Sequence, residues 1–270
     1  MGAKVVGVHG VFQYRFHEDP NELANIWRAH IDALASPDDF SLAYYSSALH
    51  TNSAQGAERF ADLDEFETDL VAAWLRSAGA PRAIAQGPAT QWIRDGLDWL
   101  VRSGATSRIA PAIVPSVFRE VGTYLRDQDR RSEARQLVAD AIRKEQPRVV
   151  VGHSLGSVVA YESLWENPDL QVETLLTLGS PLALSAVFYE HLQPDGAMTH
   201  SRPPGTKRWV NIADTGDLIA LPRHLAGFYS GIACDLETQI DLFEFHRIVP
   251  YLGSNVVREA IHKALASAES

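Results

Sequence analysis

The chain has 270 residues, 46% of them hydrophobic, and a formal net charge of −10 at pH 7. A chain of this length and composition buries a sizeable core, and we expect a single domain over residues 1–270. The acidic balance removes the general electrostatic attraction that drives binding to nucleic acid or anionic membranes. We therefore expect no nucleic-acid partner.

Cys234 is the single cysteine, so the sequence offers no internal disulfide. The opening residues, "MGAKVVGVHGVF", contain only a short apolar run, and no apolar run in the chain approaches the roughly 20 residues of a membrane span. We expect a cytoplasmic protein with no integral membrane segment. Nothing in the sequence indicates the oligomeric state.

The first fifty residues predict a strand, a helix and a second strand. The β-branched run at 4–8 is typical of a fully buried strand. Apolar residues at helical spacing predict a helix over 21–34, with Asn21 or Asp19 as its cap. Residues 40–49 predict the second strand.

A mostly helical stretch follows, over about 60–147, and contains three apolar stripes at helical spacing. Two segments within it are rich in Gly, Pro and small residues but also contain apolar residues. This composition fits a folded excursion over a pocket, with residues 80–117 as a candidate lid.

The remainder of the chain alternates strands and helices. Strands are expected at 148–152, 173–181 and 207–214, and helices at about 154–165 and 254–265. Strands that alternate with helices indicate a parallel sheet covered on both faces, which is an α/β fold.

The stretch "VVVGHSLGSVVA" contains a serine between a predicted strand and a predicted helix. Gly152 to Gly156 matches the pattern G-x-S-x-G in that context. A tight strand-to-helix turn would hold the Ser154 hydroxyl above the sheet edge as a nucleophile. The same turn would point the backbone N–H of Leu155, at the positive end of the helix, toward a developing oxyanion. The alternative is an ordinary glycine-rich loop.

A second oxyanion donor is expected after the first strand. His9 and Gly10 directly follow the buried run, and the backbone N–H of Val11 could face that of Leu155 across the substrate oxygen. In the alternative, Gly10 only forms a turn and His9 only packs in the core.

A serine hydroxyl needs a base to accept its proton, and the base needs a carboxylate that orients it. The chain order Ser, Asp, His directs the search to residues after Ser154. Asp217 is favoured as the acid, with Asp214 as the alternative, and His246, in a loop before the last helix, is favoured as the base over His224. Three other histidines fit the order poorly or are expected on the surface: His191, His200 and His262.

Five segments together resemble the α/β-hydrolase superfamily, in its lipase- and esterase-like branch. They are "VGVHGV", "VVVGHSLGS", "LLTLGSPL", "NIADTGDLIAL" and "FHRIVPYLGS", in family order over most of the chain. The resemblance implies a mostly parallel, doubly wound sheet. It also implies Ser154 as nucleophile, Asp217 as acid, His246 as base, and Val11 and Leu155 as oxyanion donors, with no cofactor.

The chain departs from the family pattern in two respects. Its large helical excursion precedes the serine turn, and the later insertion at 182–206 is short. The antiparallel strands that often precede the first oxyanion strand are expected to be absent, which would leave a sheet reduced at its N-terminal side.

The expected activity is that of a carboxylesterase- or lipase-like serine hydrolase acting on a small-molecule or acyl substrate. A thioesterase, peptidase or acyltransferase on the same fold is the alternative, as is a non-catalytic binding module of hydrolase-like fold. No H-E-x-x-H, cysteine cluster or phosphate-binding loop motif indicates a metal or nucleotide. Possible acyl-pocket residues, which could equally be core, are Trp92, Ile93, Ile113 and Phe118.

Overall fold

The structure, a computed structural model, describes residues 2–50, 60–81, 89–102, 114–193, 200–240 and 246–266. In these residues six strands form one sheet, in the order β2-β1-β3-β4-β5-β6, and every neighbouring pair is parallel. The strands are β1 (Val5–Val8), β2 (Phe40–Ala43), β3 (Val149–His153), β4 (Val172–Leu178), β5 (Thr206–Asp214) and β6 (Ile232–Thr238).

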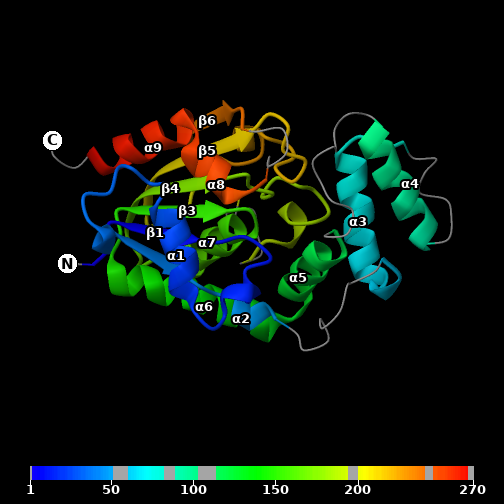
Figure 1. Cartoon of the computed structure of the whole chain (residues 1–270), viewed down its shortest axis with the longest axis horizontal. Helices are drawn as coiled ribbons and strands as arrows, with labels where there is room; N and C mark the ends of the chain where they lie inside the picture. The colour runs from blue at the N-terminus through cyan, green and yellow to red at the C-terminus, as the bar shows by residue number, and fades with distance from the viewer. Residues whose placement is uncertain are drawn as a thin grey trace.

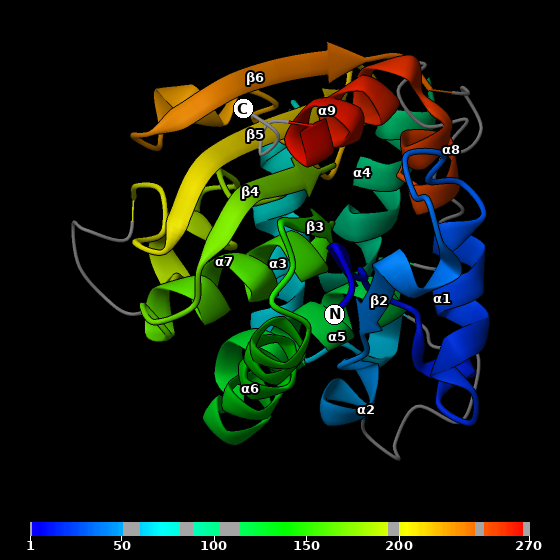
Figure 2. The ribbon, with the colours of Figure 1, turned by 90° about the vertical axis from the view of Figure 1, so that its left-hand side faces the viewer.

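Helices cover both faces of the sheet, so the predicted α/β class is confirmed (Figures 1 and 2). One face carries α6 (Gln128–Glu145) and α7 (Leu155–Glu166). The other carries α1 (Pro20–Arg28), α8 (Ile248–Gly253) and α9 (Asn255–Ala266).

The central strands are apolar on both sides because each side faces a helix layer. In β3, Val150 belongs to the core beneath α6 and α7, whereas Val149 and Val151 belong to the core beneath α1, α8 and α9. All three valines are fully buried. This is why the run "RVVV" lacks the alternation of a half-exposed strand.

The helical excursion lies between β2 and β3, and its described residues contain four longer helices. These are α3 (Glu65–Ser77), α4 (Ala89–Arg102), α5 (Val114–Arg126) and α6. Figure 1 shows α3 and α4 beyond the carboxyl ends of the strands, which the arrowheads mark. A hydrogen bond of 2.9 Å from the Trp74 indole N–H to the Leu218 carbonyl ties α3 to the loop after β5. The excursion therefore lies over the carboxyl edge of the sheet.

Short elements complete the chain: α2 (Ser46–Leu49) and the 3-10 helices at Tyr14–Phe16, Pro37–Asp39, Phe60–Asp62, Tyr189–His191 and Leu225–Gly227. Within the candidate lid, residues 82–88 and 103–113 lie outside the described residues. Among the residues that are described, no helix is both long and apolar enough to cross a membrane.

The predicted strand over 40–49 is wrong beyond Ala43. The Tyr45 amide donates to Nε2 of His9 at 3.1 Å, and the Tyr45 ring stacks on the His9 ring with centroids 4.3 Å apart. These contacts turn the chain away from the sheet, and α2 begins at Ser46.

The predicted helix over 21–34 ends six residues early, at Arg28. Asp19 is its N-cap and accepts the Asn21 amide, as one of the two expected caps. After Arg28 the chain tightens into a turn that buries Ile31. Asp32 then pairs with Arg258 of α9, a contact between distant residues that no local pattern indicates.

Candidate active site

Three side chains from three loops meet at the carboxyl edge of the sheet. The Ser154 Oγ lies 2.7 Å from Nε2 of His246, and Nδ1 of His246 lies 2.8 Å from Oδ2 of Asp217. A carboxylate only accepts hydrogen bonds, so Nδ1 carries the proton and Nε2 presents its lone pair to the serine hydroxyl. This arrangement suits proton transfer from the serine to the histidine.

Ser154 occupies a sharp turn between β3 and α7. Its backbone lies at φ 54° and ψ −131°, a region that non-glycine residues rarely adopt and that stores strain. A Cβ on Gly152 would lie 2.7 Å from Cα of Ser157, and one on Gly156 would lie 2.1 Å from the His9 carbonyl oxygen. The two glycines of the motif are therefore required by close backbone approach.

Asp217 is fully buried, and its carboxylate is held on both oxygens. Oδ1 accepts the Ile219 amide at 2.9 Å and the Ala220 amide at 3.3 Å, while Oδ2 accepts from His246 and from the Tyr251 hydroxyl, each at 2.8 Å. Backbone and side-chain donors thus fix the carboxylate in the orientation that meets the imidazole.

The two alternatives considered from the sequence are engaged elsewhere. Asp214 accepts the amides of Gly216 and Ile240 and so closes the turn after β5. His224 pairs at 3.0 Å with Glu237 on the surface. The structure thus brings Asp217 and His246, the favoured pair, to Ser154.

The loop after β1 packs directly against the serine turn. A Cβ on Gly10 would lie 2.8 Å from Cβ of Ser154. Val11 and Leu155 line the same cavity as Ser154, and their backbone amides donate to no acceptor among the described residues. Two N–H groups beside Ser154 are thus available to a molecule in the cavity.

His9 fastens this loop to the sheet. Because its Nε2 accepts the Tyr45 amide, its Nδ1 carries the proton and donates to the Gly10 carbonyl at 2.8 Å. The Tyr45 hydroxyl donates to the His9 carbonyl at 2.8 Å. Burial lowers the pKa of His9 to about 4, so the ring stays neutral and keeps both bonds at neutral pH.

A cavity of about 590 Å³ opens over the serine. One side of the cavity is a face of α5, formed by Val114, Val117, Phe118 and Val121. Phe118 was expected in this role, whereas Trp92 and Ile93 are buried and do not line the cavity. The fourth candidate, Ile113, lies outside the described residues.

The remaining cavity wall is also largely apolar. It includes Leu23, Ile26, Trp27, Trp74, Phe188, Ile219, Ile248 and Val249. Lining side chains that carry a formal charge at neutral pH, among the described residues, are Arg15 and Arg247. No group of three or more His, Cys, Asp or Glu residues in the described part of the chain could hold a metal ion.

Comparison with protein-family models, with curated proteins and with solved structures finds no match to this chain.

Two residues of the site were not predicted from the sequence. Tyr251, on α8, contacts Asp217 as described above. His153 precedes the nucleophile, and its ring lies 5.1 Å from that of His246. Burial, followed by repulsion from His246, holds the pKa of His153 well below its usual range, so it remains neutral beside the base. The sequence gives no signal for the contact of Tyr251, because this tyrosine stands in an apolar run and its partner Asp217 is distant in the chain.

Proposed function

We propose that the protein is a serine hydrolase of the α/β-hydrolase type that cleaves carboxylic esters through an acyl-enzyme. The hydrogen-bonded series from Ser154 through His246 to Asp217 carries this proposal, because each contact has the distance and direction that nucleophilic catalysis needs. The strained serine turn and the cavity above it support the same reading.

In the first half of the reaction the Ser154 oxygen attacks the ester carbonyl carbon as Nε2 of His246 takes the hydroxyl proton. The Val11 and Leu155 amides stabilise the negative oxygen of the tetrahedral intermediate, each contributing about 3 kcal/mol. The carbon–oxygen bond to the alcohol then breaks, and His246 gives its proton to the departing alkoxide. An acyl group remains on Ser154.

Water completes the cycle by the same route. His246 takes a proton from water as the water oxygen attacks the acyl carbon, and it returns that proton to the Ser154 oxygen as the acid departs. Asp217 keeps the imidazole in the reactive tautomer and stabilises it when it becomes positively charged.

The cavity favours substrates with an apolar body. Its volume of about 590 Å³ falls within the ordinary range for small-molecule sites, and its walls are mainly aliphatic and aromatic. We therefore expect esters with an extended apolar group to be cleaved faster than acetate esters.

The architecture is consistent with a reduced form of the hydrolase sheet. Nucleophile and oxyanion loops follow β3 and β1, the two strands between which the strand order reverses. Ligands of open parallel sheets bind in the crevice at such a switch point. The strand order and the position of Ser154 agree with the proposed type, although six strands are described.

A fluorophosphonate probe tests the proposal, because it forms a covalent adduct only with an activated serine. We expect stoichiometric labelling of the wild-type protein at Ser154, and no labelling of Ser154→Ala. Hydrolysis of a p-nitrophenyl ester should fall by about four to six orders of magnitude in the same variant.

Ser163→Ala is the matched control. Its hydroxyl lies on α7 within hydrogen-bond distance of two carbonyls, those of Val159 at 2.6 Å and Arg135 at 3.0 Å, and Ser163 does not line the described cavity. Labelling of Ser163→Ala should equal that of wild type. An unlabelled wild-type protein would overturn the hydrolase proposal.

A further inference from the structure

Tyr251 links the two aspartates of the loop after β5. Its side chain is fully buried, and its hydroxyl oxygen lies 2.8 Å from the Asp214 amide nitrogen and 2.8 Å from Oδ2 of Asp217. The amide can only donate, so the tyrosine oxygen accepts there, and the hydroxyl proton is directed to Asp217. The direction of this bond is therefore determined by its surroundings.

The tyrosine shares a single carboxylate oxygen with the base. Oδ2 of Asp217 accepts both from Tyr251 and from Nδ1 of His246, each at 2.8 Å. The charge that this oxygen offers to the imidazole is reduced by the second donor. Tyr251 therefore acts on the base through the acid and not through the substrate.

The surrounding backbone leaves space for this contact. Gly179, at the end of β4, has φ +54°, and a Cβ there would lie 2.9 Å from Oδ2 of Asp217 and 3.1 Å from the Tyr251 hydroxyl. A glycine in a conformation that side chains rarely adopt thus makes room for the pair. Burial, followed by the charge of Asp217, raises the pKa of Tyr251 well above its usual range, so the hydroxyl remains a donor.

We propose that Tyr251 is a positioning residue that extends the hydrogen-bonded series of Ser154, His246 and Asp217 by one member. Its hydroxyl sets how strongly the Asp217 carboxylate stabilises a protonated His246. The inference rests on the proposed hydrolase function. Tyr251 does not line the cavity among the described residues, so its effect belongs to the chemical step and not to substrate binding.

Tyr251→Phe removes the hydroxyl and keeps the ring. With a p-nitrophenyl ester, we expect kcat to fall about tenfold, because the Asp217 carboxylate loses one of the donors that orient it, and KM to stay within about twofold. Without its second donor, Asp217 holds the imidazolium more tightly. The acidic limb of the profile of kcat/KM against pH should then move to higher pH by about half a unit or more.

Tyr161→Phe is the matched control. Tyr161 is a buried tyrosine on α7, and its hydroxyl donates to the Ser201 carbonyl at 2.8 Å. This variant should keep the wild-type kcat and the wild-type pH profile. Thermal unfolding of both variants, and titration of their active sites with the fluorophosphonate, correct the rates for folded protein.

Each outcome distinguishes the two proposals. Failure of the wild-type protein to react with the fluorophosphonate overturns the hydrolase function. A reactive wild type with an unchanged pH profile in Tyr251→Phe, whether or not kcat falls, overturns the positioning role alone. A shifted profile at constant KM, absent from Tyr161→Phe, supports it.

Discussion

Two carboxylates separated by two residues have different tasks in the loop after β5. Asp217 contacts the imidazole, whereas Asp214 accepts the amides of Gly216 and Ile240. Asp217→Asn should lower kcat about ten-thousandfold, because the amide favours the wrong imidazole tautomer. We expect kcat to stay within about tenfold of wild type in Asp214→Asn.

The comparison of these two variants needs both a rate and a stability. Asp214→Asn directs an amide N–H at a backbone donor, so its free energy of unfolding should fall by about 1 to 3 kcal/mol. Urea unfolding measures this loss and ester hydrolysis measures kcat. A larger kcat loss in Asp214→Asn than in Asp217→Asn would contradict the assignment of the acid.

His9 makes the stability of the protein sensitive to pH. Its folded pKa, about 4, lies below the ordinary value of 6.5. Between these values the unfolded chain binds a proton that the folded protein does not. Stability is therefore complete above about pH 6.5 and falls as the pH drops toward 4, by roughly 3 kcal/mol for this group.

Urea unfolding at several pH values between 7.5 and 4.5 measures this effect. Burial also lowers the pKa of His153 and of His50, which adds to the slope in the same direction, so the comparison with variants is decisive. His9→Gln should reduce the dependence of the unfolding free energy on pH within this window, whatever its absolute stability. The exposed His30, changed to Gln, should leave the slope as in wild type. Equal slopes in His9→Gln and wild type would refute the prediction.

At the level of single residues, local chemistry made part of the site predictable. Ser154 and Leu155 follow from a short pattern between a strand and a helix, and Asp217 and His246 follow from chain order. Tyr251 could not be found in this way, because its role depends on a loop more than thirty residues away. Its neighbours in the sequence, Pro250 and Leu252, are apolar and resemble an ordinary core segment.

Among the elements, the first turn of α7 and the end of β1 make a very close backbone contact beside the site. A Cβ on Gly156 would lie 2.1 Å from the His9 carbonyl oxygen and 2.3 Å from that of Val8. Gly156→Ala should therefore separate α7 from the loop after β1. We expect it to lower the free energy of unfolding by at least about 3 kcal/mol and to abolish labelling by the fluorophosphonate.

Gly253→Ala, at the end of α8, is the matched control, because a Cβ there meets nothing within 4 Å. Its stability should equal or slightly exceed that of wild type, since alanine favours a helix over glycine by about 1 kcal/mol. Urea unfolding checks both variants. Wild-type stability in Gly156→Ala would show that the junction is looser than the structure indicates.

Elements with a strong periodic pattern were predictable, and elements shaped by distant contacts were not. The buried strands and three helices of the excursion, α3, α4 and α6, follow from their apolar spacing, whereas no stripe indicated α5. β6 was not predicted, because this edge strand mixes exposed charged and apolar residues without regular alternation. The loop contacts of Tyr45 and Asp32 likewise end a strand and a helix that local propensity would extend.

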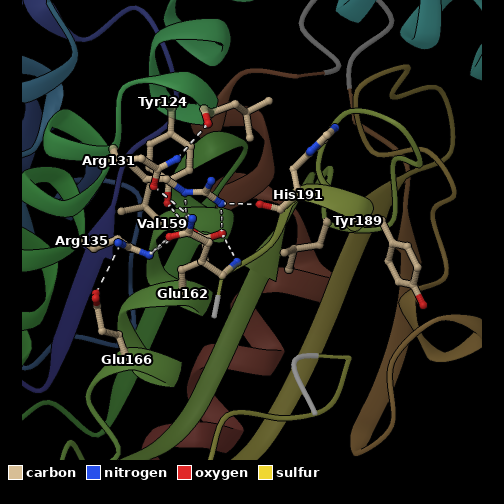
Figure 3. A network of polar contacts seen from close by, with 12 residues as sticks. Tyr124, Arg131, Arg135, Val159, Glu162, Glu166, Tyr189 and His191 are labelled. Atoms are coloured by element: carbon tan, nitrogen blue, oxygen red, sulfur yellow. Dashed lines mark hydrogen bonds and ion pairs between the residues drawn. The ribbon is translucent and has the colours of Figure 1, made fainter. Parts of the chain in front are cut away.

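In the whole molecule, a buried ionic network joins the helical excursion to the helix that carries the nucleophile (Figure 3). Glu162 of α7 has no solvent exposure and accepts from Arg131 of α6 and from the Tyr124 hydroxyl of α5. Arg131 also donates to the His191 carbonyl at 2.6 Å, and the Gln193 amide donates to Glu162 at 2.9 Å. The network thus connects α5, which lines the cavity, to α7, which begins directly after Ser154.

Removal of one partner from such a network leaves a buried charge without compensation. Glu162→Gln should lower the free energy of unfolding by about 3 to 5 kcal/mol, because the Arg131 guanidinium then lacks its carboxylate in a dry site. Glu166→Gln is the matched control on the same helix. Its carboxylate pairs with Arg135 at 3.3 Å but is half exposed, so the loss should stay within about 1 kcal/mol.

The same variants show how far the excursion positions the active site. If the network holds α5 against α7, the folded fraction of Glu162→Gln should have a raised KM for esters with long apolar groups and a nearly unchanged KM for acetate esters. The reason is that the α5 face lines the cavity, while Ser154, His246 and Asp217 are held by their contacts with one another. KM is measured without urea, at a temperature where the variant is folded. An equal rise in KM for both esters would show that the network acts on the whole site and not on the α5 face of the cavity alone.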